Sequence, residues 1–371
     1  MTAGKRKALT LMLITCAALL AAASPAMAED DRSGEGALIL AEPYQAPPGP
    51  KVPEAERLYR AGKGFEAIEL LKGVVAREPS NAPAWVQLVE LELEAGEIKE
   101  AWNHARRAAE ACPDDSRVWA MKAIARGYKA ILSLHHLNFF GLAGVRDVIH
   151  SFDRAIELNP LDVRTRLMRF EVASSGRLLS GVGRDELEEE AAHLEAIEPA
   201  AAAYARAMML GWDDEDEEAA RLLDGLVKRR PGDPKAWLAR ARHLTDWGLD
   251  EPERAREAVE SLRKAEELGM GRATAFERCR VISRAKLGKP EEREKAWLDY
   301  ISSLPDDDGP ARGRATGMLG HLHRSMGREE EGLAELKRAL ELNPLDWGLR
   351  RVLEKLERES SRGGDGVASE Q

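Results

Sequence analysis

The amino-acid sequence predicts an all-α solenoid built from repeated helix pairs. A nine-residue segment occurs twice, at 154–162 and 338–346, and the two copies differ only at Ile156 and Leu340. Helix-ending prolines recur along the chain, and the cleanest step between two of them is 34 residues. Ala, Glu, Leu and Arg dominate, aromatic residues make up only 5%, and no run of alternating β-branched residues is present. Such composition and periodicity favour helices arranged as a repeat array.

The repeated segment reads as the end of a helix followed by the start of the next. Ala and Leu or Ile at helical spacing form an apolar stripe, and Asn343 is expected to adopt a left-handed C-cap conformation. Pro344 then stops the helix, and Asp346 is placed to cap the helix that follows. The copy at 154–162 carries the same residues at the same positions and predicts the same ending.

Eight such endings divide the chain into eight units. They lie at Pro79, Pro113, Pro160, Pro199, Pro231, Gly269, Pro305 and Pro344. A tryptophan follows three of these prolines after six residues, at positions 85, 119 and 237. Glycines expected at the turn within a unit are Gly62, Gly96, Gly248, Gly288 and Gly327. Small alanines five residues after the turn or five before the proline let two helices approach closely.

The chain resembles the tetratricopeptide repeat family over residues 54–344. The second unit carries the pattern in Trp85, Leu88, Gly96, Ala101, Ala108 and Pro113. The eighth unit carries it in Leu319, Gly320, Gly327, Leu336, Ala339 and Pro344. The resemblance implies a right-handed α-solenoid of about eight helix-turn-helix repeats whose first helices line a concave groove for peptides or helices. Residues 345–359 are expected to form an amphipathic capping helix, and residues 360–371 a disordered tail.

The N-terminal 28 residues have the pattern of a secretory signal peptide. Lys5, Arg6 and Lys7 precede an uncharged apolar stretch, and Ala26-Met27-Ala28 fits a cleavage site. Residues 29–53 are acidic and then rich in proline, which is typical of an extended linker. We therefore expect export, with a periplasmic location and no membrane span after cleavage. The alternative is an N-terminal anchor that is not cleaved.

Charge and cysteine content limit the classes of partner. The formal net charge of −10 argues against nucleic acid, because phosphate binding requires a basic surface. Outside the signal segment the cysteines are Cys112 and Cys279, several units apart. Repeats touch only their neighbours, so we expect two buried free thiols and no disulfide between them.

Two groups of residues are candidate partner-binding sites. The concave groove is expected to be acidic at its N-terminal end and basic at its C-terminal end, a polarity that can orient a partner. The groove residues are Glu90, Glu94, Lys235, Arg242, Arg314, His321 and Arg324. The chaperone-tail clamp known in this family is not expected, since Glu90 stands where the resemblance places a clamp asparagine.

The second candidate is a 13-residue insertion in the third unit, at about 132–145. It is apolar and aromatic and contains His135, His136, Phe139 and Phe140. In one alternative the insertion is exposed at the surface and forms a second contact with a partner. Alternatively it lengthens both helices of the unit and packs on the next one.

Catalytic and metal-binding patterns are missing from the sequence. No nucleophile elbow, phosphate loop, zinc-protease helix or dinucleotide loop occurs, and no histidine pair has the spacing of helical metal ligands. We predict no cofactor and no catalysis, and expect a protein-interaction scaffold of the cell envelope. The alternatives are a small-ligand or metal carrier that uses the insertion and, ranked last, a hydrolase with an unrecognised site.

Overall fold

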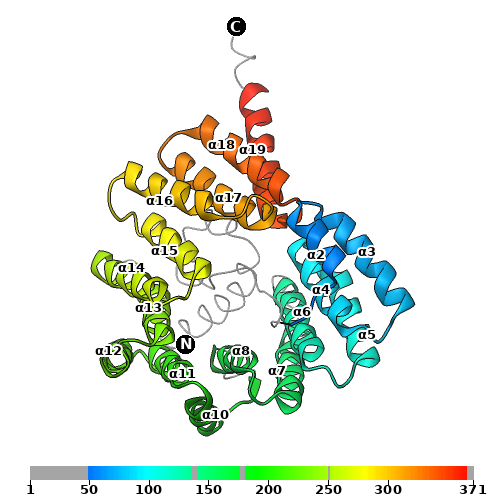
Figure 1. The fold of residues 1–371 in the computed structure, drawn as a ribbon, viewed down its shortest axis with the longest axis vertical. Coiled ribbons are helices and arrows are strands. Elements are labelled where there is room, and N and C mark those ends of the chain that lie inside the picture. The colour runs from blue at the N-terminus through cyan, green and yellow to red at the C-terminus, as the bar shows by residue number, and fades with distance from the viewer. Residues whose placement is uncertain (1–48, 135–139, 176–179, 250, 366–371) are drawn as a thin grey trace.

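The computed structural model describes residues 49–134, 140–175, 180–249 and 251–365, and this part of the chain is a solenoid of α-helices. Seventeen described helices form eight successive pairs and a final single helix (Figure 1). The pairs are α2 (Pro53–Arg60) with α3 (Gly64–Arg77), α4 (Ala82–Glu94) with α5 (Ile98–Ala111), α6 (Ser116–Leu134) with α7 (Phe140–Leu158), α8 (Val163–Ser175) with α10 (Arg184–Ile197), α11 (Pro199–Trp212) with α12 (Asp216–Arg229), α13 (Pro234–Gly248) with α14 (Pro252–Glu267), α15 (Arg272–Arg284) with α16 (Pro290–Ser303), and α17 (Gly309–Ser325) with α18 (Glu329–Leu342). The final helix is α19 (Trp347–Asp365).

The repeated nine-residue segment ends a helix largely as predicted. Helices α7 and α18 stop at Leu158 and Leu342, and the Asp346 carboxylate accepts a hydrogen bond from the Leu349 backbone N–H at 2.9 Å. The left-handed asparagine was a wrong prediction, because Asn343 has φ −134° and ψ 82°. Steric contact with a following proline disfavours helical backbone at the preceding residue and holds it extended. Gly248 is also corrected: it is the last residue of α13.

The six-residue spacing from proline to tryptophan has a physical cause. The indole N–H of Trp85 donates to the Pro79 carbonyl at 2.8 Å, and Trp119 and Trp237 do the same to the prolines before them. In two other units an arginine occupies this position. Arg166 donates to the Pro160 carbonyl at 2.7 Å, and a corresponding bond joins Arg350 to Pro344 at 2.6 Å. In these five units a side-chain N–H six residues after the proline therefore satisfies a carbonyl left free where the preceding helix ends.

The solenoid closes on itself, so that the last pair packs against the first two (Figure 1). Leu345 is completely buried in the core formed by the first three pairs. Gly96 has φ +78°, and a Cβ there would lie 2.8 Å from Cγ of Trp347. Asn343 Nδ2 donates to Glu94 Oε1 at 2.8 Å across 249 residues of sequence. The described part of the chain is thus a ring.

The first helix of each pair lies on the inner side of the ring and the second on the outer side (Figure 1). In the third pair, α6 and α7 are each 19 residues long, whereas α4 has 13. The insertion therefore lengthens both helices, as one of the two alternatives predicted. Helix α19 continues to Asp365, past the predicted end at residue 359.

Two further expectations concern cysteines and membranes. Cys112 and Cys279 are buried free thiols, as predicted. Within the described residues, no helix has both the length and the apolar character that a bilayer span requires.

Candidate functional site

Four of the seven predicted groove residues come together where the ring closes. Glu94 of α4 lies at the centre, and its carboxylate accepts from the Tyr59 hydroxyl at 2.7 Å and faces Arg314 Nη1 at 3.9 Å. Glu90 Oε2 lies 3.5 Å from Lys51 Nζ. His321 is buried on α17, and its charge acts on Asp346 at the same junction. The acidic and basic ends of the predicted groove are therefore neighbours, and they join the two ends of the solenoid.

Burial at this junction changes the ionisation of a capping residue. It raises the pKa of Asp346 to about 6, although the Leu349 N–H and the charges of Arg314 and His321 act in the opposite direction. The repeated Asn-Pro-Leu-Asp motif thus serves two purposes in the eighth unit. It ends α18, and it places Asn343 and Asp346 against the first units.

The other three predicted residues lie apart from the junction. Lys235 forms an ion pair with Glu198 at the start of α11, and Arg324 Nε lies 2.9 Å from Glu329 Oε2 between α17 and α18. Arg242 of α13 is exposed, and its guanidinium carbon lies 5.9 Å from the ring centre of Tyr204 on α11.

Arg242 belongs to a polar group built by neighbouring inner helices, which we call the inner-wall cluster. Its other members are Glu171 of α8, Tyr204 of α11 and Asp246 of α13. The Tyr204 hydroxyl donates to Asp246 Oδ2 at 2.9 Å. Burial, with the charge of Glu171, raises the pKa of Asp246 to about 8, against the lowering effects of Tyr204 and Arg242. Burial also raises the pKa of Glu171 to about 7.

The inner-wall cluster can therefore bind an anionic group. The raised pKa values of Asp246 and Glu171 favour their neutral forms, so these carboxyl groups neutralise Arg242 less than ordinary carboxylates would. Only Arg242 among these residues was predicted from the sequence. Glu171 and Asp246 were missed because they lie 75 positions apart and are brought together only by the stacking of the repeats.

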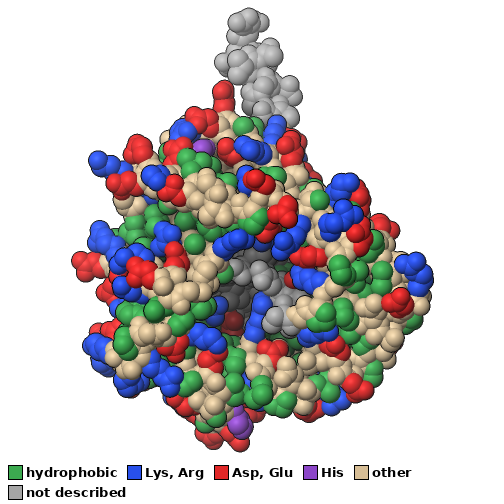
Figure 2. Space-filling view, viewed as in Figure 1, with side chains coloured by type: hydrophobic (Ala, Val, Ile, Leu, Met, Phe, Trp, Pro, Cys, Tyr) green, Lys and Arg blue, Asp and Glu red, His purple; other side chains and the backbone are tan. Residues whose placement is uncertain are grey.

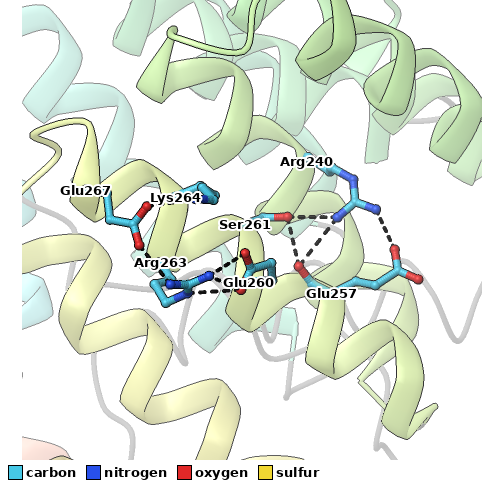
Figure 3. A network of polar contacts seen from close by, with 7 residues as sticks. All are labelled: Arg240, Glu257, Glu260, Ser261, Arg263, Lys264 and Glu267. Atoms are coloured by element: carbon cyan, nitrogen blue, oxygen red, sulfur yellow. Dashed lines mark hydrogen bonds and ion pairs between the residues drawn. The ribbon is translucent and has the colours of Figure 1, made fainter.

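A second polar arrangement lies between α12, α13 and α14, and we call it the α12–α14 network (Figure 3). Arg240 of α13 extends its guanidinium into this interface. Its Nε lies 2.6 Å from Asp224 on α12, and its Nη2 lies 2.5 Å from Glu257 on α14. Its Nη1 donates to Ser261 Oγ at 2.8 Å, and Ser261 in turn donates to the Glu257 carbonyl at 2.8 Å. The arginine is thus neutralised from both sides.

The α12–α14 network continues along the exposed face of α14. Arg263 pairs with Glu260 at 2.7 Å and with Glu267 at 2.9 Å, and Lys264 also reaches Glu267 at 2.9 Å (Figure 3). These pairs have the three- and four-residue spacing of helix neighbours and are open to solvent. They contribute little to stability, since exposed ion pairs are screened by water.

The corresponding interface between α5, α6 and α7 holds a pocket of about 290 Å³, which we call the α5–α7 pocket. Its wall comprises Trp102, Arg106, Ala109, Glu110, Trp119, Lys122, Asp147, His150 and Ser151. Lys122 Nζ lies 4.2 Å from the ring centre of Trp119. Arg126 and Lys129 approach Trp102 at 5.6 and 5.4 Å. Two indole rings therefore lie among four cationic side chains.

Lys122 is the repeat equivalent of Arg240. Each lies nine residues after the proline that ends the preceding unit, and Ser151 donates to the Asp147 carbonyl as Ser261 does to that of Glu257. Of the pocket residues, only Trp119 stood out in the sequence, through its spacing from Pro113, and none was predicted to form a site. The sequence does contain a signal for this charged position. The residue nine positions after the proline is leucine in the second unit but a cation in the third, fourth and sixth units.

The insertion that was predicted as a second contact lies only partly within the described residues. His135, His136 and Phe139 fall outside the described residues, and Phe140 is the first residue of α7. A contact through these four residues stays a prediction, as does the carrier alternative that depends on them. Within the described residues, no His, Cys, Asp and Glu side chains form a cluster able to hold a metal ion.

Comparison with known proteins identifies the repeats. Two family models, both described as tetratricopeptide repeat, match residues 58–124 and 314–344. No curated protein matches the sequence. Among solved structures, yeast Tom70 is 13% identical with a TM-score of 0.49, over 85% of this chain and 64% of its own. This chain therefore spans less than two thirds of the Tom70 chain.

Two further structures have comparable likeness. A tetratricopeptide repeat protein from Parabacteroides merdae is 12% identical with a TM-score of 0.38, over 81% of this chain and 95% of its own. The human IFIT1 dimer with PPP-AAAA is 14% identical with a TM-score of 0.45, over 85% of this chain and 74% of its own.

The matched segments lie in the first three units and in the last one, where the helix pairs, turn glycines and buried alanines have the expected positions. Repeats of this kind are protein-interaction modules. The chain thus carries tetratricopeptide repeats at residues 58–124 and 314–344.

Proposed function

We propose that this protein is a non-catalytic scaffold, exported to the periplasm, that binds an anionic segment of another protein against the inner wall of its ring. The observation that supports this most is the inner-wall cluster. There an exposed Arg242 lies beside Tyr204 and beside carboxyl groups whose pKa values are raised. Lys and Arg side chains also surround the hollow at the centre of the ring (Figure 2).

The chemistry of the cluster favours a carboxylate-bearing partner. An arginine forms two parallel hydrogen bonds with a carboxylate, and a protonated Asp246 can donate one more. A partner that enters the ring meets side chains from successive first helices, so many modest contacts add up along the wall. Export is supported by the N-terminal pattern of residues 1–28 alone.

Crosslinking in the cells that make the protein tests the binding proposal. A tagged wild-type chain is compared with Arg242→Glu and with Arg256→Glu, a matched charge reversal at an exposed position on the outer helix α14. We expect one envelope protein to be captured by the wild type and by Arg256→Glu, and to be lost in Arg242→Glu. Capture that is equal in all three chains contradicts binding at the inner wall.

Export is tested separately by the N-terminal sequence of the mature protein. We expect the mature chain to begin at Glu29, after cleavage behind Ala28. A chain that retains residues 1–28 in the membrane fraction supports the alternative of an N-terminal anchor.

A further inference from the structure

The α5–α7 pocket differs from equivalent interfaces of the same ring in one charge. In the α12–α14 network, Asp224 of the preceding outer helix neutralises Arg240. The fourth unit repeats this arrangement, because Arg169 Nε lies 2.5 Å from Asp153 on α7 and its Nη2 lies 2.6 Å from Glu186 on α10. Asp153 and Asp224 each lie seven residues before the proline that ends their unit.

In the α5–α7 pocket this position is occupied by Arg106. It lies seven residues before Pro113, so that Lys122 faces a second cation where its equivalents face an aspartate. The remaining carboxylate from the following helix, Asp147, is already paired with Arg126 at 3.1 Å. Neither Arg106 nor Lys122 has an ion pair within the described part of the chain.

The shape of the pocket follows from the same substitutions. Arg240 is long enough to fill its interface and to reach Ser261 with its own guanidinium. Lys122 is shorter and lies over Trp119 instead, and Ser151 bonds only to the Asp147 carbonyl. The cavity beside Lys122 and Ser151 has a volume of about 290 Å³, which is enough for a few side chains. Burial lowers the pKa of Lys122. The charge of Asp147 opposes this shift, and the charge of Arg106 adds to it to a smaller extent.

We infer that the α5–α7 pocket is a second interaction surface, which takes an acidic segment of a partner protein, with a carboxylate between Arg106 and Lys122 and an apolar side chain against Trp102 and Trp119. The missing carboxylate of the internal pattern is then supplied from outside. Tryptophan and arginine are the residues that contribute most at protein interfaces. The inference is independent of the inner-wall proposal, because the two sites share no residue.

Charge complementarity selects this occupant over others. Arg106 and Lys122 line the pocket, and Arg126 and Lys129 lie against the ring of Trp102, on a chain whose net charge is −10. Glu110 and Asp147 in the wall disfavour a polyphosphate chain, whereas a single carboxylate beside Arg106 and Lys122 restores the acidic charge that Asp153 and Asp224 supply in the equivalent interfaces. The exposed positions of Arg106, Glu110 and His150 leave the pocket open at the surface.

A matched pair of synthetic peptides tests the inference. The probe is a fluorescein-labelled peptide of alternating Glu, Asp and Leu residues, and its control has Gln and Asn in place of the acids. Fluorescence anisotropy at low salt is expected to show binding of the acidic peptide to the full chain and to Arg256→Asp. Binding is expected to fall at least tenfold in Arg106→Asp and in Lys122→Gln, whose helical circular dichroism confirms folding. The inference is overturned by equal binding to Arg106→Asp, by equal binding of the amide control, or by no binding to the wild type.

A photocrosslinking residue in place of Glu110, at the edge of the pocket, identifies the occupant in cells. We expect a crosslink to an acidic stretch of another protein that disappears when Arg106→Asp is added. A crosslink to residues 29–48 of the same chain, to a second copy of the chain, or to nothing overturns the choice of a partner protein.

Discussion

The α5–α7 pocket and the α12–α14 network occupy the same place in two repeats and have opposite character. In the network, Arg240 is neutralised by Asp224 and Glu257 and fills its interface. In the pocket, Lys122 faces Arg106 and leaves a cavity between two indole rings. The backbone scaffold is shared, as the matching serine-to-carbonyl hydrogen bonds of Ser151 and Ser261 show. In a repeat protein, an internal interface therefore becomes an open site when a single member of a charge pattern changes sign.

Introducing the pocket's charge into the network is expected to have the largest effect. Asp224→Arg places two guanidinium groups together at the α12–α13 contact and leaves Arg240, whose side chain is 16% exposed, with one carboxylate fewer. We expect a loss of about 2 kcal/mol in the free energy of unfolding, because a partly buried cation loses its partner. Urea unfolding followed by circular dichroism measures this loss.

The control for that measurement is Arg256→Asp, an exposed charge reversal on α14 outside the network. It is expected to change stability by less than about 0.5 kcal/mol. A loss for Asp224→Arg no larger than for this control shows that solvent already screens Arg240, and that the two interfaces are energetically alike.

Rebuilding the network inside the pocket is expected to have the next largest effect. The double variant Arg106→Asp with Lys122→Arg restores the residues that the α12–α14 network has at these positions. We expect a gain of about 1 kcal/mol in unfolding free energy, since an arginine bonds to carboxylates in two directions and fills the space above Ser151. Thermal unfolding measures the gain, and binding of the acidic peptide is expected to disappear in the same variant. A double variant that is stabilised and still binds the peptide contradicts the proposed position of the carboxylate.

Much of this architecture could be predicted from the sequence, because repeats encode local contacts. The spacing from proline to tryptophan, the turn glycines and the buried alanines each reflect contacts within one unit or between neighbours. The closure of the ring could not be predicted in this way. Glu94 and Asn343 are 249 residues apart, and their contact depends on the summed rotation of all the units between them.

The α5–α7 pocket was missed for a different reason. Its residues are ordinary surface types, and the anomaly becomes visible only when positions are aligned with the helix-ending prolines. Trp119 was noted for its spacing, yet its indole N–H serves Pro113, and its ring forms the pocket wall. A residue chosen for one structural role can therefore also form part of a site that its spacing does not indicate.

The two equivalent serines provide a smaller and more direct comparison. Ser261 accepts from Arg240 and donates to the Glu257 carbonyl, whereas Ser151 only donates to the Asp147 carbonyl. Ser261→Ala is expected to cost about 1 kcal/mol, because it leaves a bond to a charged group unmade, and Ser151→Ala about half as much. Urea midpoints of the two single variants, measured side by side, report the difference. Equal losses mean that Arg240 finds another acceptor.

The smallest expected effect on stability concerns the ionisation of Lys122. Its folded-state pKa lies below the ordinary lysine value because of burial. Asp147 opposes this shift, Arg106 adds a smaller lowering effect, and Glu110 opposes it in turn. Between these two pKa values the unfolded chain binds more protons than the folded one, so this group makes stability rise with pH there. Arg106→Asp replaces a repelling charge with an attracting one, so the pKa of Lys122 is expected to increase towards the ordinary lysine value. Stability then no longer increases with pH through this group. A carbon-13 titration of the lysine side chains, assigned with Lys122→Gln, follows the change. An unchanged pKa means that burial alone sets the value and that Arg106 lies too far away to share a ligand with Lys122.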